Sequence, residues 1–203
     1  PDLTDEEKQA AKEAIDETVK AGKENIDKAA SPEVITEAKN EALDTIQDEV
    51  DKAKLQDATN AAEKVLNDKA QSTKDAIDTL TGVDEDAKQA AKEAVDQALA
   101  DALNNVKDAQ NIAAVEEAVS NGKTAMDDIY DDLLAENNTI LENAKNAAKD
   151  ELDNAAEDAK KTIDGLPNLS DDDKQAAKDA IDKAVEEGKA AIETGTSPSD
   201  ITN

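Results

Sequence analysis

One five-residue string, KQAAK, occurs three times in this chain of 203 residues and indicates an internal repeat. The copies begin at Lys8, Lys88 and Lys174, so they lie 80 and 86 residues apart. The flanking residues match as well and read LTDEEKQAAKEAID, VDEDAKQAAKEAVD and LSDDDKQAAKDAID. A period of this length is typical of repeat proteins, in which each unit packs against its neighbours. The chain therefore holds about two and a half copies of one unit.

Apolar residues within each unit recur at steps of three and four, which places them along one face of a helix. Because a single amphipathic helix cannot bury such a stripe alone, three stripes per unit predict an antiparallel three-helix bundle. We expect Gly22, Gly122 and Gly188 to lie on these stripes and to let the helices approach closely. The stripes of the first copies are Ala11, Ile15, Thr18, Gly22, Ile26 and Ala29; Ile35, Ala38, Ala42, Ile46 and Val50; and Leu55, Ala58, Ala62, Leu66, Ala70, Thr73, Ile77 and Leu80.

Helix ends are marked by residues with a physical role at those positions. Thr4 followed by Glu7 predicts a capping box, and Ser170 before three aspartates repeats the arrangement. Ser31 before Pro32 predicts a helix that starts with a cap and a first-turn proline. The residues expected to end helices are Gly82, Gly165 and Pro167.

The sequence leaves two alternatives open for the segments between these ends. Residues 33–81 and 112–164 contain no Pro and only one Gly, so each could form a single helix of about 50 residues. The other alternative is a break near residues 54–60 and 136–139. Caps for the new helices would then be Asn60 with Glu63 and Thr139 with Glu142.

The predicted fold is all-α and consists of tandem antiparallel three-helix bundles in an elongated, spectrin-like rod. We assign one complete bundle to residues 55–134. Residues 1–54 would be two helices of a preceding repeat, and residues 135–203 the first two helices of a following repeat. Continuous helices would be shared between neighbouring bundles. The chain is thus expected to be a piece of a longer protein.

Composition argues against catalysis and against a bound cofactor. The chain has no His and no Cys, so it lacks the usual general base and the usual ligands of transition metals. A carboxylate pair would need a shaped, partly apolar pocket to separate its pKa values, and no Trp or Phe is available to build one. The aspartates at 171–173 lack the spacing of a calcium loop and suit a helix N-terminus. We therefore predict no enzyme activity, no catalytic residue, no metal and no cofactor.

Charge restricts the partners. The chain carries 51 acidic and 23 basic residues, a net charge of −28, which repels nucleic acid and anionic membrane surfaces. No apolar run approaches the roughly 20 residues of a membrane span. We expect a monomer whose partners are adjacent repeats of the same chain, with no nucleic acid and no membrane insertion in this segment.

The capped helix LTDEEKQAAKEAID, followed by an apolar residue and then SPEVITEAKNEALDTI, resembles a known family. It is similar to the domain-of-unknown-function tandem repeats of Gram-positive cell-wall-anchored adhesins, as in staphylococcal surface protein C and matrix-binding protein Ebh. Those repeats often carry Pro near the position of Asp48 or Glu49; its absence here favours continuous helices. The resemblance covers nearly the whole chain and implies an extracellular helical stalk that supports adhesion or biofilm formation. It transfers no catalytic residue.

Three functions compete. The leading prediction is a stalk that projects an adhesive domain from the cell wall. The alternative is a three-helix module that binds a host serum or matrix protein directly, with Met126 and Tyr130 as the candidate contact residues because aromatic residues and Met are enriched at interfaces. The competing interpretation of this pair is that it fills the core. A late-embryogenesis-type hydration protein is the third candidate, and the long capped repeat argues against it.

Overall fold

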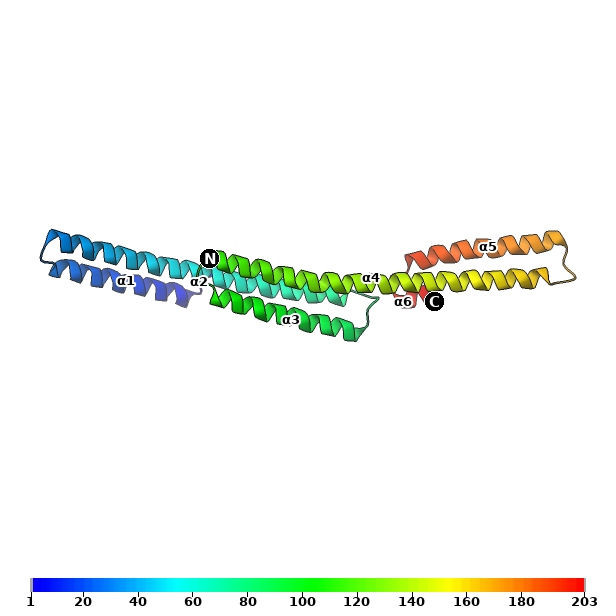
Figure 1. Ribbon diagram of the computed structural model, residues 1–203, viewed down its shortest axis with the longest axis horizontal. Helices are drawn as coiled ribbons and strands as arrows, with labels where there is room; N and C mark the ends of the chain where they lie inside the picture. The colour runs from blue at the N-terminus through cyan, green and yellow to red at the C-terminus, as the bar shows by residue number, and fades with distance from the viewer. Residues whose placement is uncertain (1, 203) are drawn as a thin grey trace. The chain divides into compact units, whose positions relative to one another are not determined.

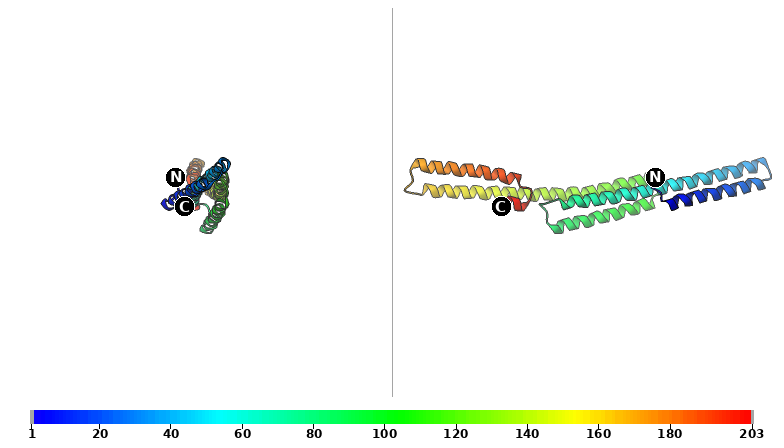
Figure 2. Two further views of the ribbon diagram at one scale, coloured as in Figure 1. Left: turned by 90° about the vertical axis from the view of Figure 1, so that its left-hand side faces the viewer. Right: turned by 180° about the vertical axis from the view of Figure 1, so that it is seen from behind.

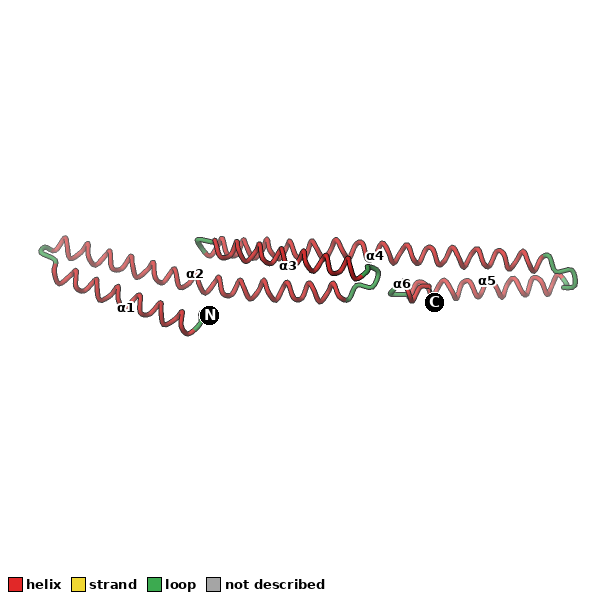
Figure 3. Tube along the Cα trace, turned by 90° about the horizontal axis from the view of Figure 1, so that it is seen from below, coloured by secondary structure: helices red, strands yellow, loops and turns green. Residues whose placement is uncertain are grey.

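The computed structural model describes residues 2–202, and every regular element in that range is an α-helix (Figure 3). The prediction of an all-α bundle of packed helices is confirmed. Pro1, the first residue of the predicted segment 1–54, and Asn203, the last residue of the predicted segment 135–203, lie outside the described residues. The helices are α1 (Asp5–Lys28), α2 (Pro32–Asp78), α3 (Glu85–Asp108), α4 (Ile112–Asp164), α5 (Asp171–Thr194) and α6 (Pro198–Thr202).

The two long helices are continuous. α2 has 47 residues and α4 has 53, so at 1.5 Å per residue they are about 70 Å and 80 Å long. The alternative with breaks near residues 54–60 and 136–139 is therefore wrong. Thr139 does not cap a helix, because its hydroxyl donates to the Ala135 carbonyl oxygen, 2.9 Å away within α4. Asn60 does not cap a helix either: its side-chain NH2 donates to the Asp2 carbonyl oxygen and to Glu7, and its Oδ1 accepts from Gln56, one turn earlier in α2.

The predicted caps form. Thr4 Oγ1 accepts from the Glu7 amide at 3.1 Å, and the Glu7 carboxylate accepts from the Thr4 amide at 2.7 Å, which completes the capping box of α1. The backbone N–H of Thr4 is the main reason why the pKa of Glu7 is lowered. Ser170 caps α5 by accepting from the Asp173 amide at 3.2 Å. Ser31 accepts from the Val34 amide at 3.4 Å ahead of Pro32.

The chain divides into two compact units, each described by itself. The first consists of Pro1–Thr73 and Val95–Asp127, and holds α1, most of α2, the second half of α3 and the start of α4. There α1 runs antiparallel beside the first half of α2, after a short loop (Figure 1). Farther along, α2, α3 and α4 pack as three helices. The core of this part is Leu66, Val95, Ala102, Val106, Val115 and Met126, all at most 3% exposed.

The second unit consists of Lys74–Ala94 and Asp128–Asn203. It holds the end of α2, the start of α3, the rest of α4, and α5 and α6. α5 runs antiparallel beside the last part of α4, and α6 lies at the end of α5 that is remote from the α4–α5 loop (Figure 2, right). The residues buried here include Ile77, Leu80, Val83, Leu133, Ala156 and Ile201.

Burial depends on how many helices meet. Where three helices pack in the first unit, Leu66 and Val106 are 0% and 1% exposed. Where α1 and α2 form only a pair, Ile15 and Ile26 are half-buried, and Ile35 is 42% exposed. A pair of helices covers each apolar stripe from one side only, so the stripe retains contact with solvent. The best-formed cores therefore lie in the three-helix segments.

The glycine prediction is confirmed by close helix contacts. A Cβ placed on Gly22 would lie 2.7 Å from the Ala42 Cβ, and one on Gly122 would lie 2.5 Å from the Ala102 Cβ. A Cβ on Gly188 would lie 2.8 Å from Leu152 Cδ2. Real Cβ atoms do not approach other carbons so closely. At Gly22 and Gly122 the opposing atom is a fixed Cβ, so these two positions set the distance between helices, whereas at Gly188 it is the end of a flexible leucine side chain.

We expect added monovalent salt to raise the melting temperature. With 51 acidic and 23 basic residues, carboxylates repel one another over most of the surface, and about 0.1 M salt screens such repulsion beyond about 10 Å. Ion pairs such as Lys160–Asp182, between α4 and α5, are partly exposed, so screening them should cost little stability. Thermal unfolding followed by circular dichroism at rising NaCl concentration measures the balance. A falling melting temperature would mean that the ion pairs outweigh the repulsion.

Candidate functional site

The described residues show neither a metal centre nor a membrane helix. In residues 2–202, no three acidic side chains come together in a way that could hold a metal ion. None of the helices in this range is both long and apolar enough to cross a membrane.

The two predicted contact residues have different surroundings. Met126 belongs to the first unit and is 0% exposed, so its side chain is part of the core and is not available to a partner. Tyr130 belongs to the second unit and is half-buried, with exposed aspartates at 128, 131 and 132 around it in the sequence. Of the two, only Tyr130 presents surface to solvent. A partner-binding role for this position stays a prediction.

The lysines of the KQAAK motif hold the end of the preceding long helix. Lys88 Nζ donates to the carbonyl oxygen of Asp78, the last residue of α2, at 3.4 Å. Lys92 forms an ion pair with the carboxylate of the same residue. The hydrogen bond between Lys92 and the Asp78 carboxylate raises the pKa of Lys92. A cation at a helix C-terminus is favourable because the unpaired carbonyls there carry partial negative charge.

The next copy repeats this contact 86 residues later. Lys174 Nζ donates to the carbonyl oxygen of Asp164, the last residue of α4, at 3.1 Å, and Lys178 pairs with its carboxylate. In the first copy, Lys8 pairs instead with Asp5 on its own helix at 3.3 Å. The repeated motif therefore acts as a clamp across the turn between a long helix and a short one. The sequence signal for it is an Asp ten residues before the first lysine of the motif.

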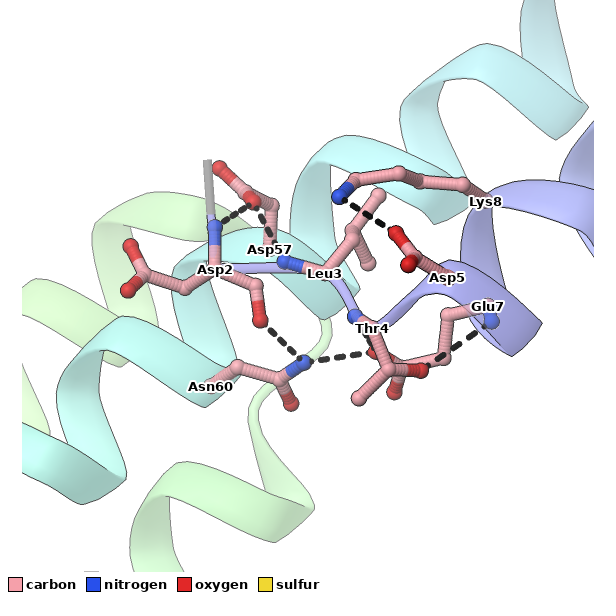
Figure 4. A network of polar contacts seen from close by, with 8 residues as sticks. All are labelled: Asp2, Leu3, Thr4, Asp5, Glu7, Lys8, Asp57 and Asn60. Atoms are coloured by element: carbon pink, nitrogen blue, oxygen red, sulfur yellow. Dashed lines mark hydrogen bonds and ion pairs between the residues drawn. The ribbon is translucent and has the colours of Figure 1, made fainter.

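A second repeated contact fastens the segment that leads into α1 onto α2 (Figure 4). Asp57 Oδ1 accepts from the backbone amides of Asp2 and Leu3, the latter at 3.0 Å. Asn60, one turn farther along α2, donates to the Asp2 carbonyl oxygen at 3.0 Å and to Glu7 Oε2 at 2.8 Å. The start of α1 is thus tied to α2 through backbone and cap together.

A similar contact occurs at the position 80 residues later, where Asn137 replaces Asp57 and binds loop amides that lie 79 residues after Asp2 and Leu3. Asn137 Oδ1 accepts from the Thr81 amide at 3.0 Å and from the Gly82 amide at 2.6 Å. Asn137 is 5% exposed, and a Cβ on Gly82 would lie 2.5 Å from its carbonyl oxygen. We call the contacts of Asp57 and Asn137 the loop pins. In both, one side-chain oxygen on a long helix accepts from two successive amides of the loop before a KQAAK helix.

The Asp57 pin should depend on pH. The backbone amides of Asp2 and Leu3 lower the pKa of Asp57, so the contact favours the ionised carboxylate. Its contribution is fully present above the unfolded-state pKa of about 3.9 and is lost as the pH falls through the lower folded-state pKa. Asp57→Asn, which copies Asn137, should remove this dependence. The measurement is the amide chemical shift of Leu3 between pH 6 and 2; an equal titration in both proteins would contradict the assignment.

Comparison with known proteins gives three matches to one family and several relatives. The family described as Domain of Unknown Function (DUF1542) matches residues 1–54, 58–132 and 144–203. The extracellular matrix-binding protein EbhA of Staphylococcus aureus strain Newman is 32% identical over 171 residues, which is 84% of this chain and 5% of that protein. The extracellular matrix-binding protein ebh of strain NCTC 8325 / PS 47 is also 32% identical over 171 residues, 84% of this chain and 2% of that protein.

The chain thus spans a twentieth or less of the length of these curated relatives. No solved structure matches it. The resemblance to the repeats of staphylococcal surface adhesins, inferred from the KQAAK helix and its surroundings, is confirmed by the relatives and by three successive matches along the chain. This chain belongs to the DUF1542 family and is related to the repeat region of the staphylococcal matrix-binding protein Ebh.

Proposed function

We propose that this chain is a spacer of an extracellular, cell-wall-anchored protein of a Gram-positive bacterium, and that it holds an adhesive domain away from the cell wall. The observation that carries the proposal is the continuity of α2 and α4, with 47 and 53 residues. With repeats at 1–54, 55–134 and 135–203, each long helix belongs to two successive repeats. A continuous helix bends far less readily than a loop linker, so the junctions would be stiff.

The loop pins support the same proposal. Asp57 and Asn137 each lie three residues past a proposed repeat boundary, on the helix that crosses it. Each holds the loop of the KQAAK helix against that crossing helix. A spacer gains from such contacts because they resist opening of the junction without presenting anything to a partner. The acidic surface then keeps the chain hydrated and keeps neighbouring chains apart.

A second candidate function is direct binding of a matrix or serum protein. Two observations favour it: the relatives are called extracellular matrix-binding proteins, and Tyr130 presents a half-exposed aromatic side chain. Tyr is enriched at protein interfaces, but an interface usually needs several such residues close together. This chain has one Tyr, no Trp and no Phe, which favours the spacer.

A binding screen of the 203-residue chain separates the two functions. Albumin, fibronectin and immunoglobulin would be tested by surface resonance or calorimetry, with Tyr130→Ala as the matched variant. The spacer proposal predicts that neither the wild-type chain nor the Tyr130→Ala variant binds any of these three host proteins in a saturable way. A micromolar or tighter complex that Tyr130→Ala abolishes, with an unchanged melting temperature, would establish the binding module instead.

A further inference from the structure

An apolar groove remains open in the second unit, between the last part of α4 and α5. It encloses about 560 Å³. α6 enters at one end, where Ile201 is only 5% exposed and lies against Gly195, whose added Cβ would be 2.6 Å from Ile201 Cγ1. The residues that line the groove include Ala144, Ala148, Leu152, Gly188, Ile192 and Ile201.

The first unit shows the same positions with a helix in place. Leu66, Ala102 and Val106 are the counterparts, 86 residues earlier, of Leu152, Gly188 and Ile192. All three are buried, at 0%, 3% and 1% exposed, where the start of α4 packs over α2 and α3. The counterparts in the second unit are only half-buried.

The first turn of the covering helix is present in both units. α4 starts at Ile112 and brings Val115 into the core of the first unit, at 2% exposed. Ile201 occupies the corresponding position of α6, and the Ser197 hydroxyl accepts from the Asp200 amide at 3.1 Å as an N-cap does. α6 therefore has the start, the cap and the first buried contact of a third helix.

We propose that the groove between α4 and α5 receives the third helix of this repeat, of which α6 is the first turn, and that this helix carries Ala where it crosses Gly188. The proposal rests on the assignment of the chain as a repeat array. To the three-helix repeat expected from the sequence it adds the groove in which the third helix lies and the residue that sets the register of that helix.

The choice of Ala follows from the two crossings that are formed. One pairs Gly22 with Ala42, and the other pairs Ala102 with Gly122, so each crossing holds one Cβ. A second Cβ would stand 2.7 Å or 2.5 Å from the first. Two glycines would instead leave a gap the size of a methyl group. Since α5 supplies Gly188, the helix that covers it must supply the Cβ.

The test extends the full chain after Asn203 with the sequence of residues 38–54. In this register the appended segment continues from α6, and its fifth residue, the counterpart of Ala42, crosses Gly188. Four proteins combine Ala or Gly at this fifth residue with Gly188 or Gly188→Ala. Amide hydrogen exchange of residues 144–152 and 188–192 reports coverage of the groove. The cycle of four cancels the different helix propensities of Ala and Gly.

We expect the extension with Ala over Gly188 to slow exchange in the groove by about tenfold or more. The two mixed pairs have one Ala and one Gly. Together they should protect the groove more than the Ala–Ala and Gly–Gly pairs together do, by about fivefold per mixed pair. An extension with Asp at the counterparts of Ile46 and Val50 is the matched control and should give no protection.

Two results would overturn the proposal. If the groove exchanges as fast with the Ala extension as without it, while residues around Leu66 stay protected and so show a folded chain, the groove is not the seat of this helix. If the Ala–Ala pair is protected as well as the mixed pairs, the register is wrong. Neither result bears on the screen against host proteins, so failure here is distinguishable from failure of the spacer function.

Discussion

Gly122→Ala should lower the free energy of unfolding by about 1–3 kcal/mol, the usual effect of overpacking a close contact. The new Cβ would lie 2.5 Å from the Ala102 Cβ and 2.9 Å from Leu66 Cδ2. Ala102 is a short side chain without a rotamer that could yield, so the helices must move apart. On helix propensity alone the same change would stabilise by about 1 kcal/mol, so the sign of the effect is diagnostic. Urea unfolding followed by circular dichroism measures it.

A compensating change sharpens this test. Ala102→Gly in the Gly122→Ala protein reproduces the arrangement of Gly22 and Ala42 in the first repeat, and should restore at least about half of the loss. Gly165→Ala is the control, because the atom nearest to its added Cβ is 3.5 Å away, an ordinary contact. If Gly122→Ala stabilises the chain, the close approach of helices does not depend on this glycine.

Asn137→Ala should be the second severe change, with a loss of about 1–3 kcal/mol. It removes the one side-chain oxygen that accepts from both Thr81 and Gly82, and it leaves a gap at a position that is 5% exposed. Amide exchange at Thr81 and Gly82 should also become faster.

Asn137→Asp is the matched control, since the chain itself carries Asp57 at the corresponding position. An ionised carboxylate can accept from both amides, so this variant should be close to wild type near neutral pH. If Asn137→Ala and Asn137→Asp unfold alike, the pin is not what stabilises this loop.

Local features of the fold could be predicted because they depend on nearby residues. The stripes follow from helical spacing, and the Thr4 capping box depends on a partner three residues away. The glycines could be placed on stripes because the copies align. The continuity of α2 could not be decided in advance, since Asn60 is a plausible cap as well as a tolerable helix residue. In the structure, the Asn60 side chain donates to Asp2 in the segment before α1, more than 50 residues away in the sequence.

The contacts of the candidate site could not be predicted from the sequence either, because they also join residues that are far apart in the chain or on opposite sides of a turn. The KQAAK motif was visible, but its clamp on Asp78 needs the turn geometry between α2 and α3. The loop pins join residues that are 54 to 56 apart, and only the 80-residue offset between Asp57 and Asn137 hints at a shared role. From the sequence, Met126 could belong to a core or contact a partner, with the core as the preferred interpretation, and its side chain is 0% exposed in the first unit.

The central claim is that helices run unbroken through the repeat junctions, and a distance across one junction tests it most directly. The chain has no Cys, so Asn40→Cys and Lys64→Cys place two spin labels at exposed positions on either side of residues 54–55. A continuous α2 predicts a single narrow distance distribution centred near 36 Å, from 24 residues at about 1.5 Å each. A broad distribution, or one centred well below that distance, would show a flexible or broken junction and would contradict the spacer account.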